Sequence, residues 1–167
     1  MSTIYLLLGA NLGDRFSQLS NAFKEIEERI GYVIKYSALY ETAAWGREDE
    51  PSYLNQVLCV TTDLTPHELL KTIHEIESDL GRTRQMRWES RLIDIDILFY
   101  NEMVLDDPDL IIPHPYIHKR KFTLVPLAEI ASEYRHPVLL KTVEQLLAEL
   151  NDPLKVIKLP SKRGDRE

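Results

Sequence analysis

The spacing of apolar residues along the first half of the chain alternates between strand and helix periods. An apolar run at 3–8 is typical of a strand, and Asp14 then suits the start of a helix with apolar positions up to Ile30. Segments 32–42 and 53–62 are rich in β-branched and aromatic residues, which favour strands. The pattern therefore predicts a strand, a helix and two more strands.

The second predicted helix has a clear beginning. Thr65, Pro66 and Glu68 form a capping-box sequence with proline at the first helical position. An apolar stripe continues along this helix, which we expect Gly81 to end. An arginine-rich loop follows, and the apolar segment 91–100 then predicts a fourth strand.

The order of these elements, β-α-β-β-α-β, predicts the fold class. It is typical of an α+β protein with a ferredoxin-like core, in which helices pack against an antiparallel sheet. Helical patterns at 122–131 and 143–150 predict additional C-terminal helices. Because the sequence contains no repeat, low-complexity tract or linker, we expect residues 1–167 to form a single domain with a disordered tail at about 160–167.

Composition and charge limit the classes of function. The chain has 167 residues, 44% of them hydrophobic, and its net charge of −7 disfavours nucleic-acid binding. It contains neither a signal-peptide pattern nor an apolar run long enough to cross a membrane, so we expect a cytoplasmic protein. The single cysteine, Cys59, excludes an internal disulfide. Arginines gather at 82–91 and a basic HKRK run occupies 118–121, which favours either a small anionic ligand or a solvated basic loop.

Two acidic residues interrupt the most strand-like segment, RLIDIDILFY at 91–100. Alternation along a strand puts Asp94 and Asp96 on one face, roughly 6–7 Å apart, and the isoleucines on the other face. Unpaired carboxylates at that distance repel by about 2–3 kcal/mol at an effective dielectric constant of ~20. Either the upstream arginines offset this repulsion in a salt-bridge network, or divalent metal does. Paired carboxylates suit Mg²⁺ and can hold two such ions for phosphoryl transfer.

The arginine-rich loop suits a polyphosphate. Arg82, Arg84, Arg87 and Arg91 carry planar, bidentate donors that match phosphate oxygens. Phosphoryl transfer depends mainly on positioning and on neutralising charge, which such a loop can supply. Trp88, in the same loop, either stacks on a base or anchors the loop on the core.

Aromatic and amide residues suit a flat heterocycle. Tyr53 and Asn55 face the same way if a strand begins there, and Phe122 can supply an opposing ring. Taken singly, each of them is more simply explained by ordinary packing.

Three further residues have a simple structural interpretation beside a functional one. His74 and Glu77 lie one helical turn apart and are most simply part of a solvated helix face. His114, whose backbone is fixed between two prolines, is either a catalytic histidine or, more simply, a donor to phosphate or ribose.

Six motifs, in order along the chain, resemble those of the 6-hydroxymethyl-7,8-dihydropterin pyrophosphokinases of folate biosynthesis. They are GANLGD at 9–14, YETAAWG at 40–46, PSYLNQV at 51–57, IESDLGRTR at 76–84, WESRLIDIDIL at 88–98 and IPHPYIHKRKF at 112–122, followed by VPLAEIA. GANLGD alone is neither of the common glycine-rich nucleotide motifs and predicts only a strand-to-helix turn. The resemblance extends from about Thr3 to Ala131 and is far more specific than any single motif.

The resemblance implies an enzyme that uses Mg²⁺, transfers diphosphate from ATP to the hydroxymethyl group of the pterin and releases AMP. It implies that Asp94 and Asp96 bind two Mg²⁺ ions and act in catalysis together with Arg82 and Arg91. The residues implied for ATP binding are His74, Glu77, Arg82, Arg84, Trp88, Arg91, Ile97, His114 and Arg120. The residues implied for pterin binding are Thr42, Ala43, Trp45, Tyr53, Asn55, Asp94 and Phe122, with the pterin stacked between Tyr53 and Phe122.

Some positions depart from the family pattern. Glu89 and Ser90 stand where the family usually has a Gly-Pro pair. Trp45 stands where we expect a smaller apolar residue, and Tyr116 stands where the family commonly has an arginine. These departures concern loop contacts more than the reaction. We identify no general base and expect a monomer that acts on small molecules.

Two alternatives to this function remain open. One is another metal-dependent phosphoryl or nucleotidyl transferase on the same scaffold, which would release ADP or diphosphate instead of AMP. The other is a ligand-binding module without catalysis, whose aspartates are paired with arginines and whose nucleotide affinity does not depend on Mg²⁺.

Overall fold

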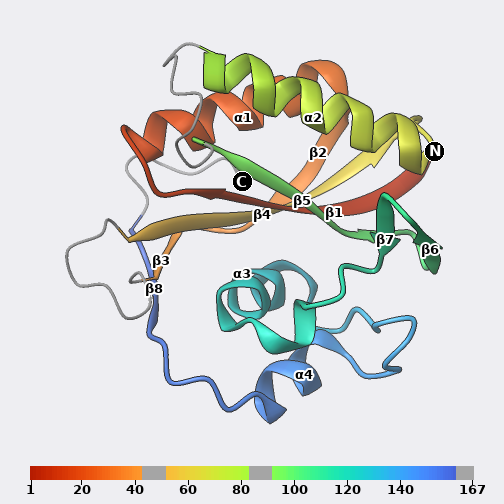
Figure 1. The fold of residues 1–167 in the computed structure, drawn as a ribbon. Coiled ribbons are helices and arrows are strands. Elements are labelled where there is room, and N and C mark those ends of the chain that lie inside the picture. Colours follow the sequence, from red (N-terminus) through yellow and green to blue (C-terminus); the bar gives the residue numbers. More distant parts are fainter. Residues whose placement is uncertain (43–51, 83–91, 161–167) are drawn as a thin grey trace.

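The computed structural model describes residues 1–42, 52–82 and 92–160 (Figure 1). Its elements are β1 (Ser2–Ala10), α1 (Arg15–Arg29), β2 (Gly31–Tyr36), β3 (Tyr40–Thr42), β4 (Tyr53–Thr62), α2 (Pro66–Arg82), β5 (Asp94–Tyr100), β6 (Leu105–Asp107), β7 (Leu110–Ile112), η1 (Ile117–Lys119), α3 (Lys121–Ala131), α4 (Val143–Glu149) and β8 (Val156–Lys158). The β-α-β-β-α-β order expected from the sequence is present, with β2 and β3 together in the place of its second strand.

The main sheet is antiparallel throughout. Its strands follow the order β5-β1-β4-β3-β8, and β2 also pairs with β4. The strand nearest the N-terminus thus lies between the third and fourth strands of the core, as in a ferredoxin-like fold. The α+β fold class expected from the sequence is confirmed.

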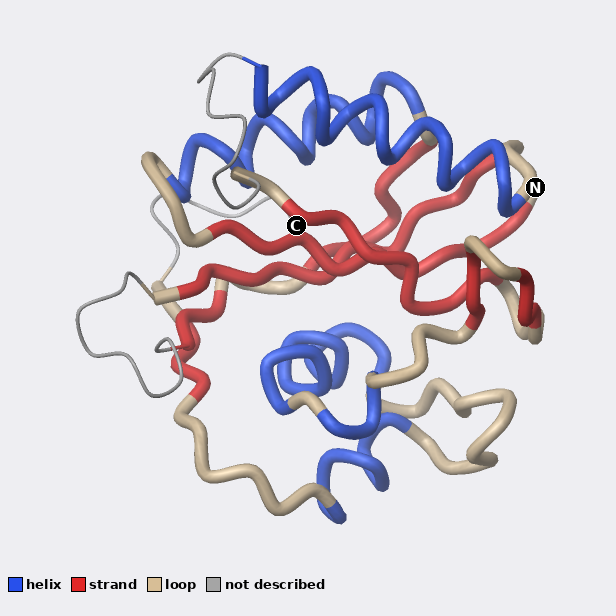
Figure 2. Tube along the Cα trace, in the orientation of Figure 1, coloured by secondary structure: helices blue, strands red, loops and turns tan. Residues whose placement is uncertain are grey.

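Helices cover both faces of this sheet. Helices α1 and α2 lie on one face, and α3 and α4 lie on the other (Figures 1 and 2). One apolar cluster joins the sheet to α1 and α2 through residues such as Leu19 and Ile73, and a second joins it to α3 and α4 through residues such as Leu124 and Val143. The expected C-terminal helices are α3 and α4. They cover the face of the sheet on which the cleft described below opens.

The start of α2 follows the sequence prediction. The Thr65 backbone N–H donates to Glu68 Oε1 at 2.9 Å, and the Glu68 N–H donates to Thr65 Oγ1 at 3.3 Å, which completes the capping box. The helix continues one residue past Gly81, so this glycine does not end it. No helix in the described part of the chain is long and apolar enough to cross a membrane.

The expected second strand, 32–42, is divided into β2 and β3. Ser37, between them, donates its N–H to the Val57 carbonyl at 2.9 Å, and its Oγ accepts the Val57 N–H at 3.0 Å. The serine hydroxyl therefore replaces a backbone carbonyl in the ladder, and regular pairing is interrupted. The small β6–β7 hairpin and strand β8 were not expected from the sequence.

Candidate active site

A cleft of about 380 Å³ opens on the α3 side of the main sheet, where β1 ends and where β4, β5 and α3 begin. Its lining combines carboxylates, amide and hydroxyl groups, aromatic rings and one arginine. The lining residues are Leu7, Gly9, Thr42, Tyr53, Asn55, Asp94, Asp96, Arg120, Phe122 and Leu154. Most of them were predicted as metal, ATP or pterin contacts from the sequence.

The register of the strands brings these side chains together. Gly9 on β1 pairs with Asp94 on β5 and with Asn55 on β4, and Asn55 in turn pairs with Tyr40 on β3. Directly paired residues project from the same face of a sheet. These paired residues form one row across four strands, and this row places Asp94 and Asn55 at the same cleft although they are far apart in the sequence.

The two aspartates project from β5 as the alternation predicted. Asp94 is exposed and Asp96 is half-buried, and both line the cleft. Ile95 and Ile97 project from the opposite face and are buried in the cluster beneath α1 and α2. Two carboxylates on one strand face form a donor set of hard oxygens, and this set fits Mg²⁺.

Two buried oxygens face this cleft without a hydrogen-bond partner among the described residues. They are Asn55 Oδ1 and Thr42 Oγ1, on side chains that are only 5% and 4% exposed. The Asn55 amide is oriented by its other end, because Nδ2 donates to the Leu8 carbonyl at 3.1 Å. An unpaired buried polar atom costs about 1–3 kcal/mol, so both oxygens are suited to accept hydrogen bonds from a ligand.

Gly9 makes room for this amide. A Cβ atom at position 9 would lie 2.8 Å from Asn55 Nδ2, closer than side-chain atoms approach one another. The sequence motif at 9–14 was interpreted as a strand-to-helix turn, but β1 continues through Ala10, so Gly9 is a strand residue and this expectation was wrong in part. The turn itself is confined to the positions before α1, where Gly13 has a positive φ of 63°.

Aromatic rings and an arginine form the wall at the start of α3. Tyr53 and Phe122 both line the cleft. The Arg120 guanidinium lies over the Phe122 ring, 5.5 Å from its centroid, and over the Tyr116 ring at 5.2 Å. Cation–π contacts of this kind hold the positive charge of Arg120 at the cleft wall, where an anionic ligand can reach it.

His114 lies beside this wall and is neutral at physiological pH. Burial, and secondly the charge of Arg120, lower the pKa of His114 from 6.5 to about 4. Its Nδ1 accepts the Tyr116 N–H at 3.1 Å, so the neutral ring carries its proton on Nε2. His114 is therefore a hydrogen-bond donor through Nε2, rather than a second positive charge.

Other predicted residues lie away from the cleft or outside the described part. His74 is exposed on the outer side of α2, and the Glu77 carboxylate accepts the Ile95 N–H at 2.8 Å. Together with Ile97, they are absent from the cleft lining that the structure describes. The predicted residues outside the described part are Ala43, Trp45, Arg84, Trp88 and Arg91, together with the side chain of Arg82 and the tail at 161–167.

Sequence reasoning missed a network beside the cleft. Arg15 Nη1, at the first position of α1, donates to Glu41 Oε2 at 3.0 Å and to the Ser52 carbonyl and hydroxyl at 2.9 and 2.8 Å. Hydrogen bonds from Ser52, and then from Arg15, lower the pKa of Glu41. Glu41 precedes Thr42 and Ser52 precedes Tyr53, so Arg15 holds together the two strand ends that carry these lining residues.

Sequence reasoning also missed the contribution to the cleft of the segment that follows α4. Leu154 lines the cleft, and Asp152 accepts the Leu154 N–H at 3.0 Å and the Lys121 N–H, at the start of α3, at 3.5 Å. The second contact joins residues 31 positions apart, so no local pattern could have revealed it.

Comparisons with known proteins agree on a family. Residues 5–132 match the family described as 7,8-dihydro-6-hydroxymethylpterin-pyrophosphokinase (HPPK). A relative from Aquifex aeolicus, named 2-amino-4-hydroxy-6-hydroxymethyldihydropteridine pyrophosphokinase, is 41% identical over 89% of this chain and 92% of its own length. A Bacillus subtilis protein of the same name is 41% identical over 77% of this chain and 78% of its own. Wild-type Plasmodium falciparum HPPK-DHPS shares the fold, with a TM-score of 0.71 at 19% identity over 89% of this chain and 44% of that one.

Proposed function

The chain belongs to the 7,8-dihydro-6-hydroxymethylpterin-pyrophosphokinase family, and we propose that the cleft beside Asp94 and Asp96 is the site of its reaction. The enzyme transfers diphosphate from ATP to 6-hydroxymethyl-7,8-dihydropterin in folate biosynthesis. One observation carries the assignment of the site. The two carboxylates line a single cleft with the Asn55 and Thr42 oxygens, which have no hydrogen-bond partner among the described residues.

The buried end of this cleft would bind the pterin. A pterin ring carries an amino group and ring N–H groups, which donate hydrogen bonds to the Asn55 and Thr42 oxygens. The rings of Tyr53 and Phe122 stack on the flat faces of the heterocycle. A cleft of about 380 Å³ lies in the lower part of the range for small-molecule sites.

The end of the cleft beside β5 would bind the triphosphate. Asp94 and Asp96 would hold two Mg²⁺ ions, which supply positive charge to the phosphate oxygens. Arg120 contributes a positive charge from the cleft wall, and the neutral ring of His114 donates a hydrogen bond to the phosphates through Nε2. We propose that Arg82 and Arg91 also contact the phosphates, and the remaining ATP contacts implied by the resemblance stay predictions.

The reaction joins these two ends. The pterin hydroxymethyl oxygen attacks the β-phosphorus of ATP, and a new oxygen–phosphorus bond forms. The bond from the β-phosphorus to the oxygen that bridges to the α-phosphorus breaks, so AMP leaves with that oxygen, and the hydroxyl proton passes to water. The side chains contribute position and charge, which is the main requirement of phosphoryl transfer, and we assign no general base.

Product identification with an aspartate variant tests this site. Incubation of the protein with ATP, Mg²⁺ and the pterin should yield AMP and pterin diphosphate in equal amounts. Asp96→Ala should abolish AMP formation, because the carboxylate pair is lost, and it should leave the fold intact because Asp96 lies at the cleft surface.

A matched control is Asp106→Asn, which removes a carboxylate from the exposed β6–β7 hairpin and should retain activity. Full activity of Asp96→Ala would refute the proposed site. Release of ADP or diphosphate by the wild-type protein would favour a different transferase.

We propose further that residues 1–167 act as a monomeric single domain in the cytoplasm, where ATP is available. Sedimentation at catalytic concentrations should show a monomer.

A further inference from the structure

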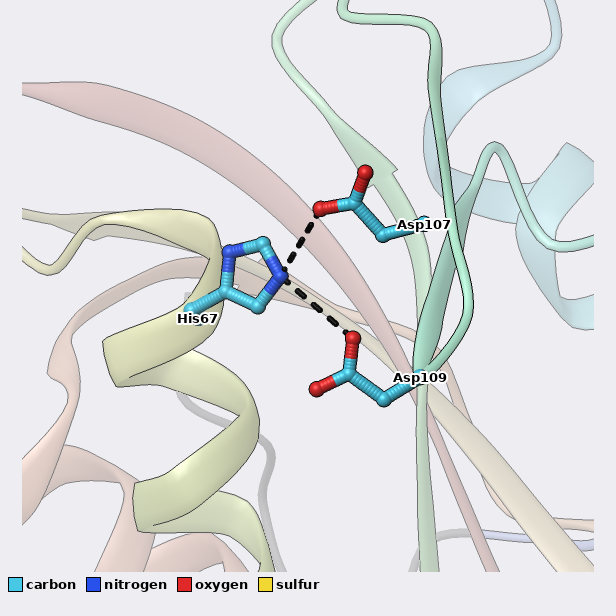
Figure 3. A group of neighbouring side chains, drawn as sticks. All are labelled: His67, Asp107 and Asp109. Atoms are coloured by element: carbon cyan, nitrogen blue, oxygen red, sulfur yellow. Dashed lines mark ion pairs between the residues drawn. The ribbon is translucent and has the colours of Figure 1, made fainter.

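A cluster of metal-ligating side chains lies outside the cleft. His67 projects from the first turn of α2, and Asp107 and Asp109 project from the β6–β7 hairpin. Figure 3 shows the imidazole pointing between the two carboxylates. None of these residues lines the cleft in the part of the chain that the structure describes.

The distances from the imidazole nitrogen to the two carboxylate oxygens fit one bound ion. His67 Nε2 lies 3.1 Å from Asp107 Oδ2 and 3.6 Å from Asp109 Oδ1, and the three ligand atoms lie within 4.8 Å of one another. Nitrogen and oxygen ligands of Zn²⁺ lie ~2.0–2.2 Å from the ion, so neighbouring ligands around it are about 2.8–3.6 Å apart in octahedral or tetrahedral geometry. The measured separations from Nε2 lie within or at the edge of this interval.

The donor set favours one class of metal. One imidazole nitrogen with two carboxylate oxygens suits divalent transition ions such as Zn²⁺, whereas Mg²⁺ prefers oxygen ligands alone. Three protein ligands leave further positions for water. The cluster adjoins a hollow of about 600 Å³ that is lined by His67, Asp109, Lys71 and Ser78 among others, and this hollow gives water and ions access.

The local charge also favours a cation. The partial positive charge at the start of α2 opposes one, but Asp106, Asp107 and Asp109 place three carboxylates within four positions of the hairpin. Without metal, the contacts of the imidazole with the two carboxylates are exposed to solvent, since the side chains of His67, Asp107 and Asp109 are 48%, 40% and 69% exposed. Exposed pairs of this kind add only ~0–1 kcal/mol of stability.

We propose that His67, Asp107 and Asp109 form a binding site for a divalent transition-metal ion of the Zn²⁺ class, independent of the catalytic cleft. The site would join the start of α2 to the hairpin that follows β5. Since the metal would bind the folded chain and not the unfolded one, it would also stabilise the fold.

Calorimetric titration of Zn²⁺ into the full chain, in buffer that contains Mg²⁺, tests the proposal. We expect one Zn²⁺ binding event that persists in an Asp94→Asn/Asp96→Asn variant, which separates it from the proposed catalytic metals. His67→Ala and Asp107→Asn should each weaken it at least about tenfold, since each removes a ligand. Asp106→Asn is the matched control, because it removes the same charge from the same hairpin but no ligand, and its affinity should stay within about twofold of wild type.

Thermal unfolding gives a second measurement. Zn²⁺ should raise the melting temperature of the wild type and of Asp106→Asn, but not that of His67→Ala. The melting temperatures without metal show that each variant is folded. Three results would overturn the proposal: no Zn²⁺ binding by the wild type, undiminished binding by His67→Ala, or equal weakening by Asp106→Asn and Asp107→Asn.

Discussion

Gly9→Ala is the smallest change that should disturb pterin binding. The new Cβ would lie 2.8 Å from Asn55 Nδ2, whereas ordinary van der Waals contact begins at 3.4 Å. The amide must therefore move by about 0.6 Å or more. Its hydrogen bond to the Leu8 carbonyl, now 3.1 Å long, is stretched or lost, and Oδ1 is displaced from its position in the cleft.

The size of the effect follows from these contacts. Loss of the bond to Leu8 weakens the fold with or without ligand, whereas misalignment of Oδ1 with a pterin donor weakens binding by about 0.5–1.5 kcal/mol. That loss corresponds to an increase of about 2- to 13-fold in the KM for the pterin. The KM for ATP should be unchanged, because Asn55 lies at the pterin end of the cleft.

Steady-state kinetics of a double-mutant cycle give the assay. Asn55→Ala should raise the KM for the pterin by at least as much as Gly9→Ala. In the Asn55→Ala background, Gly9→Ala should add nothing, since the next atom near the new Cβ is the Leu54 carbonyl oxygen at 3.9 Å. An unchanged KM in Gly9→Ala, or additive effects in the double variant, would refute the role given to this pair.

Three further predictions concern positioning and stability. Arg15→Ala should raise the KM for the pterin, and it should lower the free energy of unfolding in urea by about 1–3 kcal/mol, because the hydrogen bonds of Arg15 to both strand ends are lost. An unchanged KM and an unchanged free energy of unfolding would exclude a positioning role for Arg15. Burial lowers the pKa of His114 in the folded chain from its ordinary 6.5 to about 4. Between pH 6.5 and pH 4 the unfolded chain therefore binds a proton at this histidine that the folded chain does not, so the free energy of unfolding should fall as the pH drops through this range. His114→Gln should flatten that part of the pH profile, and an identical profile would contradict the lowered pKa. Thr65→Ala should cost about 0.5–2 kcal/mol in the same unfolding assay, through loss of the α2 cap, with the KM values preserved.

Local patterns in the sequence were sufficient for the fold class. Strand alternation placed Asp94 and Asp96 on one face and the isoleucines on the other, and the structure bears this out. The capping box at Thr65 fixed the start of α2 because both of its hydrogen bonds join residues three positions apart. Signals of this kind depend on neighbours in the chain, so they can be recognised before the fold is known.

Features that join distant residues could not be predicted in this way. The Gly9–Asn55 contact depends on the register of β1 with β4, and the Arg15 network depends on where α1 begins relative to two strands. The helical period placed His74 outside the apolar stripe of α2, and the structure shows it exposed there. The contact of His74 with ATP that the family resemblance implies stays a prediction.

The most direct test of the two-aspartate site is calorimetry with an unhydrolysable ATP analogue, with and without Mg²⁺. Because Asp94 and Asp96 are proposed to hold the metal that neutralises the triphosphate, Mg²⁺ should increase the affinity of the wild type for the analogue. The same addition should have little effect on an Asp94→Asn/Asp96→Asn variant whose melting temperature matches that of the wild type. Affinity of the wild type that is indifferent to Mg²⁺, or a full Mg²⁺ effect in the variant, would contradict the proposed site.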